Sequence, residues 1–249
     1  RVADEKGHNA LRQRLANMVF DQGGIACSFN QTVSEQNLSQ VPDVVEWFRS
    51  NPHKAHTLVF ILYREPSMGA AFTFFANGQA IKPDEFYNDT DFRGEQVLKT
   101  QDVVDQIRRC EPNYEPCGYL NGTVEPESMK WTIAIRFATK DQTLGFAGAN
   151  FMKLVQQFSH FTRNRWLSYS SPKTLRLGLP AMLFFSMFDK GCRRSVAGWF
   201  KSMLKNPGLL FKKVYMQSYA IIQPIDFLPD GRMDMCDGCP DMTVYNGQL

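Results

Sequence analysis

The sequence has no segment long enough to cross a bilayer, because its best apolar run, residues 177–188, is shorter than the roughly 18 residues that a span needs. Its polar first residues do not have the pattern of a signal peptide. Charge is almost balanced, with 28 Lys and Arg against 25 Asp and Glu, and a net charge of +3 does not indicate nucleic acid. We therefore expect a cytoplasmic protein with no nucleic-acid partner.

Several catalytic motifs are also missing. The four histidines show no His-x-x-x-His spacing, which argues against a histidine zinc site. Neither a Gly-rich phosphate loop nor a nucleophile elbow is present. Six cysteines in 249 residues are too few for a small scaffold built on disulfides. The chain has no starting Met and ends in an expected strand, so we expect a piece of a longer protein.

The first half alternates helices with apolar strands. The expected elements are a helix with Leu11, Leu15, Met18 and Val19 on its apolar face, a strand at about 25–30, a helix ending near residue 50 and a strand at 57–63. Unbroken apolar strands between helices are typical of a parallel sheet covered by helices. The pattern therefore predicts an α/β fold in which these two strands are parallel.

The second half mixes element types. A hairpin turn is expected at Ala76-Asn77-Gly78-Gln79. The other expected elements are helices at about 100–109 and 150–161, a basic helical segment within 173–216, and strands at 131–137, 219–227 and 242–245. We place a domain boundary near residue 145, which divides the chain into 1–145 and 146–249.

The sharpest chemical signal is Cys236-Asp237-Gly238-Cys239. A Cys-x-x-Cys turn places two thiolates on one side of the chain, which suits zinc or an iron–sulfur cluster. A redox dithiol and an idle reduced pair are the alternatives. Cys117 lies in a proline-flanked loop and is a further candidate ligand, whereas Cys27 and Cys192 are interpreted as small core residues.

A basic segment spans residues 190–213, and it contains no acidic residue. Its cations alternate with large apolar side chains; they are Lys190, Arg193, Arg194, Lys201, Lys205, Lys212 and Lys213. This composition is typical of a helix that lies on an anionic membrane surface. The alternative is a solvated basic face over an ordinary core.

Four stretches resemble the radical S-adenosylmethionine (radical SAM) enzymes. The run Gly7-His8-Asn9-Ala10-Leu11 and the segment Ser28-Phe29-Asn30-Gln31-Thr32-Val33 are similar to the middle of that family, and the strand ending at Arg64-Glu65-Pro66 to its fifth strand. The tail from Asp226 into the Cys-x-x-Cys turn resembles members with an auxiliary cluster. The resemblance implies an incomplete TIM-like (β/α) partial barrel with a C-terminal α+β extension.

The resemblance also implies cofactors, namely S-adenosylmethionine and a [4Fe–4S] cluster that starts radical chemistry on an unknown small-molecule or lipid substrate. An electron donor such as ferredoxin or flavodoxin is implied as a partner. Ser28 and Asn30 would contact the ribose of S-adenosylmethionine, and Arg64 its carboxylate.

The auxiliary cluster would be bound by Cys236 and Cys239, with Cys117 as a possible ligand and another ligand beyond Leu249. The family's Cys-x-x-x-Cys-x-x-Cys loop and its Gly-Gly-Glu segment are not in this sequence and would lie upstream of Arg1. This chain alone is therefore not expected to catalyse. The competing interpretations are a non-catalytic zinc-binding module and a peripheral membrane-associated protein.

Overall fold

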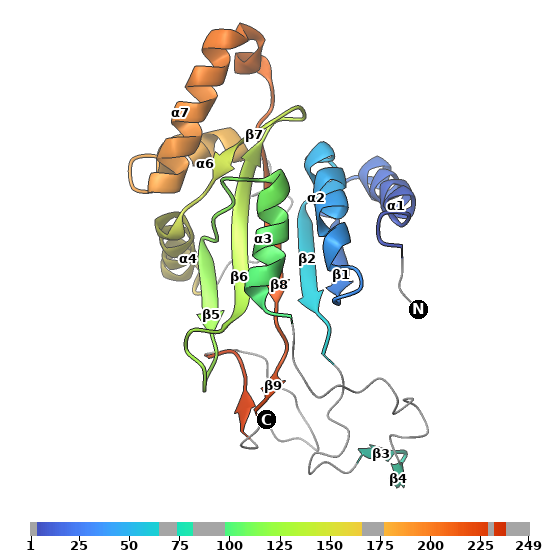
Figure 1. The fold of residues 1–249 in the computed structure, drawn as a ribbon. Coiled ribbons are helices and arrows are strands. Elements are labelled where there is room, and N and C mark those ends of the chain that lie inside the picture. Colours follow the sequence, from blue (N-terminus) through green and yellow to red (C-terminus); the bar gives the residue numbers. More distant parts are fainter. Residues whose placement is uncertain (1–3, 65–73, 82–97, 166–176, 229–231, 238–249) are drawn as a thin grey trace.

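The structure is a computed structural model that describes residues 4–64, 74–81, 98–165, 177–228 and 232–237 (Figure 1). The expected strand at 242–245 lies outside these ranges, as do Cys239 and the turn at 229–231. The described helices are α1 (Asn9–Gln22), η1 (Leu38–Gln40), α2 (Val41–Ser50), α3 (Thr100–Cys110), α4 (Ala149–Arg163), α6 (Gly178–Phe185), α7 (Lys190–Lys205) and η4 (Pro207–Phe211).

A six-stranded sheet forms the centre of the protein. Its strands are β1 (Ser28–Val33), β2 (Thr57–Leu62), β5 (Gly118–Asn121), β6 (Met129–Ala138), β7 (Thr143–Phe146) and β8 (Tyr215–Ile222). The order is β1-β2-β8-β6-β5, and β7 also pairs with β6. Two small hairpins lie apart from it: β3 (Phe74–Ala76) with β4 (Gln79–Ile81), and β9 (Asp226–Phe227) with β10 (Met233–Asp234).

The parallel pairing expected for the first two strands is confirmed, with Ser28 opposite Thr57 and Val33 opposite Leu62. The strand β8 extends the parallel set on the other side of β2. The next strand, β6, runs antiparallel to β8, β5 and β7. The fold is therefore mixed α/β with an open sheet, in which three neighbouring strands are parallel.

The sheet does not follow the boundary that we place near residue 145. Strand β8 comes from the last third of the chain, yet it lies between β2 and β6. Its Tyr219 and Ile221 pack in the same core as Leu58 and Phe60 of β2. Because this core contains both segments, a division into 1–145 and 146–249 does not separate two independent units.

The two faces of the sheet carry different helices (Figure 1). Helices α2 and α3 cover one face and bury Leu58, Phe60 and Tyr219 against Phe48 and Ile107. Helices α4, α6 and α7 cover the other face over β5–β7, in a second core that contains Met182 and Trp199. At β1 no described helix covers this second face. Ser28, Asn30 and Thr32 point to it and are exposed, whereas Gln31 and Val33 point to the first face and are buried.

The first helix buries a different face from the one that we predict. Leu11, Leu15 and Met18 are exposed, whereas Arg12 and Ala16 are buried. Burial of Arg12 is possible because its guanidinium forms an ion pair with Glu5 and donates to the Glu5 carbonyl oxygen over 2.7 Å. The apolar stripe of α1 therefore lies exposed, on a helix that is hydrogen-bonded to α2 through Gln13 and Trp47.

Local signals elsewhere agree with the structure. The turn at Asn77 and Gly78 joins β3 to β4, with the positive φ angles of 51° and 77° that such hairpins need. The basic segment is helical, as expected. Within the described residues, no helix is both long and apolar enough to span a bilayer.

Candidate functional site

The parallel strands bring their carboxyl ends to one edge of the sheet, here called the carboxyl edge. Arg64 follows β2 by two residues, and Gln223 follows β8 directly. Strand β6 runs antiparallel to β8, so its first residues, including Lys130, lie at this edge. Strand β5 is antiparallel to β6 and therefore ends there, at Asn121. Ligands of open α/β sheets usually bind outside the carboxyl ends of parallel strands, so this edge is the first place to look for a site.

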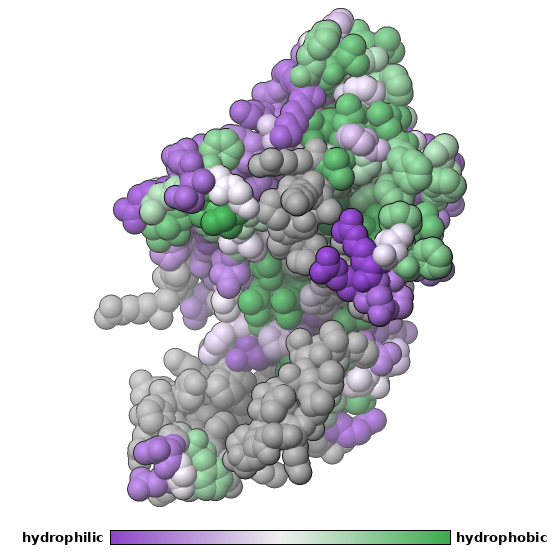
Figure 2. Space-filling view, turned by 180° about the vertical axis from the view of Figure 1, so that it is seen from behind, coloured by the Kyte–Doolittle hydropathy of each residue, from purple (hydrophilic) through white to green (hydrophobic). Residues whose placement is uncertain are grey.

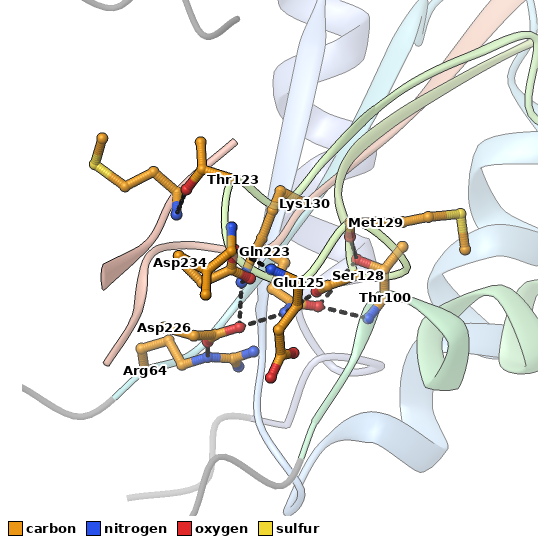
Figure 3. Close-up of polar contacts among 12 residues, drawn as sticks. Arg64, Thr100, Thr123, Glu125, Ser128, Met129, Lys130, Gln223, Asp226 and Asp234 are labelled. Atoms are coloured by element: carbon orange, nitrogen blue, oxygen red, sulfur yellow. Dashed lines mark hydrogen bonds and ion pairs between the residues drawn. The ribbon is translucent and has the colours of Figure 1, made fainter. Parts of the chain in front are cut away.

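Buried charges meet at the carboxyl edge (Figure 3). Lys130 is only 1% exposed and forms ion pairs with Asp226 and Asp234, the latter over 2.7 Å from Nζ to Oδ2. Arg64 approaches Asp226 with 2.6 Å between Nε and Oδ1. We call Arg64, Lys130, Gln223, Asp226 and Asp234 the carboxyl-edge cluster.

Hydrogen bonds complete the carboxyl-edge cluster. Gln223 donates from Nε2 to Asp226 Oδ2 over 2.6 Å and accepts at Oε1 from the Thr100 backbone N–H over 3.0 Å. Asp234 Oδ1 accepts from the backbone N–H groups of Val124 and Glu125. Burial alone would raise the pKa of Asp234, but the hydrogen bonds from Lys130 and from these two N–H groups hold it below its ordinary value. Two cations and two carboxylates therefore neutralise each other within one buried network.

The cluster fixes the position of the tail. Asp226 and Asp234 belong to β9 and β10, so their ion pairs tie this hairpin to the sheet. Cys236 lies two residues after Asp234, and its backbone forms an isolated antiparallel β-bridge with Gly122, the residue after β5. The backbone on either side is bonded too, because Thr123 N–H donates to Met235 O and Asp237 N–H donates to Asn121 O. Half-buried Cys236 is thereby held at the carboxyl edge.

The other candidate ligands do not join Cys236. Cys117 directly precedes β5, at the end of this strand opposite to Cys236. Five residues separate it from Gly122, the bridge partner of Cys236, which is about 16 Å along a strand at roughly 3.3 Å per residue. It is buried, and burial raises the pKa of its thiol to about 12. No group of three or more His, Cys, Asp or Glu side chains converges on a metal position within the described ranges. Cys239 lies outside those ranges.

Ser28 and Asn30 are not at the carboxyl edge. The expected strand at about 25–30 begins at Ser28 instead and continues to Val33, because Gly23 and Gly24 adopt positive φ angles and an extended loop precedes the strand. Ser28 is therefore at the opposite end of the parallel strands from Arg64. Both side chains are exposed on the face that α2 and α3 leave uncovered.

Arg64 does lie at the carboxyl edge, as expected. Its guanidinium is occupied by groups of this chain: besides Asp226, it donates from Nη2 to the Leu98 carbonyl oxygen over 2.8 Å. The carboxylate that Arg64 meets in this structure is that of Asp226.

An open hollow of about 610 Å³ adjoins the cluster on the α3 side. Its lining residues are Lys99, Thr100, Gln101, Glu125, Pro126, Glu127, Ser128, Met129 and Gln223. Because Gln223 and Ser128 belong to both the hollow and the hydrogen-bond network, the hollow is next to the buried charges. A smaller hollow of about 180 Å³ lies between η4 and the β6–β7 turn, away from the strand ends.

Sequence reasoning missed Lys130, Gln223 and Asp234 as members of a site. One signal for Lys130 was its position inside an apolar strand, in Met129-Lys130-Trp131. Because buried lysines are rare unless they are paired, this position indicates a carboxylate partner nearby. Comparisons with protein-family models, with curated proteins and with solved structures gave no match for this chain.

Proposed function

We propose that this chain is part of a radical SAM enzyme and contributes the later strands of its catalytic sheet and a tail that ligates an auxiliary [4Fe–4S] cluster. The observation that carries the proposal is the arrangement of β1, β2 and β8. These strands are parallel, α2 and α3 cover one face, and the charged carboxyl edge adjoins the tail with Cys236. A β/α barrel also has parallel strands with helices on their outer face. In this sheet that resemblance is limited to β1, β2 and β8, since β6 runs antiparallel to β8 and α4, α6 and α7 cover the other face farther along.

The uncovered face of β1 supports this proposal. Ser28, Asn30 and Thr32 are exposed there, beside half-buried Val59 and Ile61 of β2. In a barrel this face would be the inner one. Hydroxyl and amide groups on it are suited to hydrogen-bond the ribose or amino-acid part of a ligand such as S-adenosylmethionine.

The edge at β1 gives a second argument. Among the strands that the structure describes, β1 pairs only with β2, and helix α1 exposes Leu11, Leu15 and Met18. An unpaired strand edge and an exposed apolar stripe are costly in a soluble fold and are normally covered. Further β/α units that pack on β1 and α1 would cover both, as a larger partial barrel requires.

The tail supplies the third argument. Iron in such clusters is bound by Cys thiolates. Of the two thiols of the Cys-x-x-Cys turn, the described one, Cys236, is held at the carboxyl edge, whereas Cys117 is buried at the opposite end of β5. We therefore assign the auxiliary site to Cys236 and Cys239 together with ligands outside this chain, and we no longer include Cys117.

When bound, a [4Fe–4S] cluster with S-adenosylmethionine supplies a strong hydrogen-abstracting radical. The role proposed for this chain is to bind and orient. Asn30, midway along the uncovered face of β1, would contact the cofactor, the carboxyl-edge cluster would hold the tail, and the hollow beside Thr100 and Gln223 is the proposed place for part of a substrate. An electron donor such as ferredoxin or flavodoxin would be the redox partner.

The test uses the protein expressed from its complete gene and reconstituted without air. Reduced with dithionite in the presence of S-adenosylmethionine, it should release 5′-deoxyadenosine. Asn30→Ala should raise the concentration of S-adenosylmethionine needed for half-maximal release about tenfold, since one hydrogen bond is worth on the order of 1 kcal/mol and its buried partner is left unpaired. Asn113→Ala, at another exposed asparagine, should change nothing.

Two outcomes would contradict the proposal. One is a protein that binds iron and sulfide but releases no 5′-deoxyadenosine. The other is a colourless protein that contains stoichiometric zinc, which would favour the zinc-binding module instead.

A further inference from the structure

The lobe formed by α4, α6, α7 and η4 exposes large apolar side chains. Helix α6 and the turn after it expose Leu183, Phe184 and Phe188. Leu204 at the end of α7 is 82% exposed, and Phe211 at the end of η4 is 89% exposed. Figure 2 shows hydrophobic surface gathered at the upper end of the molecule, the end that α7 occupies in Figure 1, and along one side below it.

These side chains form a surface and are not scattered singly. The Phe184 ring lies 5.1 Å from the Phe185 ring and 5.9 Å from the Phe188 ring, measured between centroids. On α7, Ala197, Phe200 and Leu204 follow one another at i, i+3 and i+7, so they share one side of the helix. An isolated exposed leucine needs no explanation, but a continuous apolar surface of this kind marks an interaction site.

Basic side chains border the apolar surface. Lys190, Arg194, Lys201 and Lys205 follow one another at helical spacing, so they line the side of α7 next to Phe200 and Leu204. All four are exposed. Arg194 pairs with Glu115, but Lys190, Lys201 and Lys205 form no ion pair with any residue that the structure describes. The border therefore presents cations that are available to an external partner.

We propose that this lobe docks on an anionic membrane surface, with the apolar side chains of α6, α7 and η4 at the acyl boundary and the lysines of α7 against lipid phosphates. Charge complementarity favours this partner. A symmetric contact with a second copy would bring the same lysines face to face, which is repulsive. Nucleic acid would match the lysines but not Leu204 or Phe211.

The geometry suits a helix that lies along the interface. Helix α7 has 16 residues and is amphipathic, with Cys192, Ser195 and Trp199 buried on its inner side. Its outer side combines an apolar strip with lysines, which is the pattern of interfacial helices. The inference does not depend on the proposed radical chemistry, although a membrane-bound substrate would be consistent with both.

The test measures co-sedimentation of the chain with vesicles of neutral phosphatidylcholine and with vesicles that also contain phosphatidylglycerol. The chain should pellet with the anionic vesicles, and pelleting should fall steeply with added salt, because exposed charges are screened over about 10 Å at 0.1 M. Each basic residue near such a surface is worth about 1 kcal/mol, or roughly fivefold in binding. The double variant Lys201→Glu, Lys205→Glu should therefore bind at least 25-fold more weakly, by about 5 × 5.

A second variant, Leu204→Ser with Phe211→Ser, tests the apolar part and should also reduce binding while leaving the fold intact, since both side chains are exposed. The matched controls are Arg14→Glu and Met18→Ser, at exposed positions of α1, and they should bind like the unchanged chain. Equal binding to neutral and anionic vesicles would overturn the proposal. So would absence of binding, or equal losses in the α1 controls.

Discussion

Lys130 gives the sharpest test of the carboxyl-edge cluster. Its ammonium group is buried between Asp226 and Asp234, so Lys130→Met removes the cation that both carboxylates share. Removing one partner of a buried ion pair typically costs about 3–5 kcal/mol, because the remaining charge is left uncompensated. Here Asp226 keeps Arg64, and Asp234 keeps two backbone N–H donors. We therefore expect a loss near the lower limit, about 3 kcal/mol.

The assay is urea denaturation of the chain, in which the midpoint should fall by about 1 M or more if the slope is about 2–3 kcal/mol/M. Lys140→Met, at an exposed turn position, is the control and should change the free energy of unfolding by less than about 0.5 kcal/mol. Adding Asp234→Asn to Lys130→Met should recover part of the loss, since the uncompensated carboxylate is then removed.

The same variant tests whether the cluster holds the tail. The amide protons of Thr123 and Asp237, which bond across the junction between tail and sheet, should exchange faster in Lys130→Met than in the unchanged chain. A shared buried charge is contradicted if Lys130→Met lowers the free energy of unfolding by less than about 1 kcal/mol. It is also contradicted if the losses from Lys130→Met and Asp234→Asn add in the double variant.

Two further predictions concern the helical lobe. Asp189 accepts hydrogen bonds from the backbone N–H groups of Cys192, Gly148 and Phe151, which outweigh the effect of burial and lower its pKa. Because the pKa is lowered, the carboxylate stabilises the fold fully well above the ordinary pKa of about 4, and this stabilisation is lost as the pH falls through the lower pKa of the folded state. Asp189→Asn should therefore cost about 2 kcal/mol at neutral pH and make stability depend less on pH in acid, as measured by denaturation at several pH values. Gly191→Ala should destabilise the fold by more than about 2 kcal/mol, because the added Cβ would lie 2.5 Å from Gly148 N and 2.6 Å from Phe146 O. The control, Ala197→Gly on the outer side of the same helix, should cost only about 1 kcal/mol. A stabilising Gly191→Ala, or an unchanged acid profile in Asp189→Asn, would contradict the respective packing and capping arguments.

Part of the fold was predictable because the signals were local. An unbroken apolar run and its flanking helices predict the parallel pair β1 and β2, and Asn77-Gly78 predicts a hairpin. The place of β8 was not predictable in this way. Its insertion between β2 and β6 is a pairing between residues far apart in the sequence, and no local pattern encodes which strand will be its neighbour.

The candidate site shows the same limit. Arg64 was predicted at a strand end and lies there, but the strand boundary at Ser28 was misplaced by three residues, which moved Ser28 and Asn30 away from the carboxyl edge. The apolar spacing of Leu11, Leu15 and Met18 predicts a helix correctly but not its buried face. That face depends on Glu5 neutralising Arg12, which is a tertiary contact.

The iron and sulfide content of the complete gene product after anaerobic reconstitution tests whether the tail binds an auxiliary cluster. We expect the double variant Cys236→Ser, Cys239→Ser to lose about four irons per protein, the content of one cluster, and Cys117→Ala to lose none. Equal iron content in all three proteins would contradict this expectation, and so would an equal loss in Cys117→Ala.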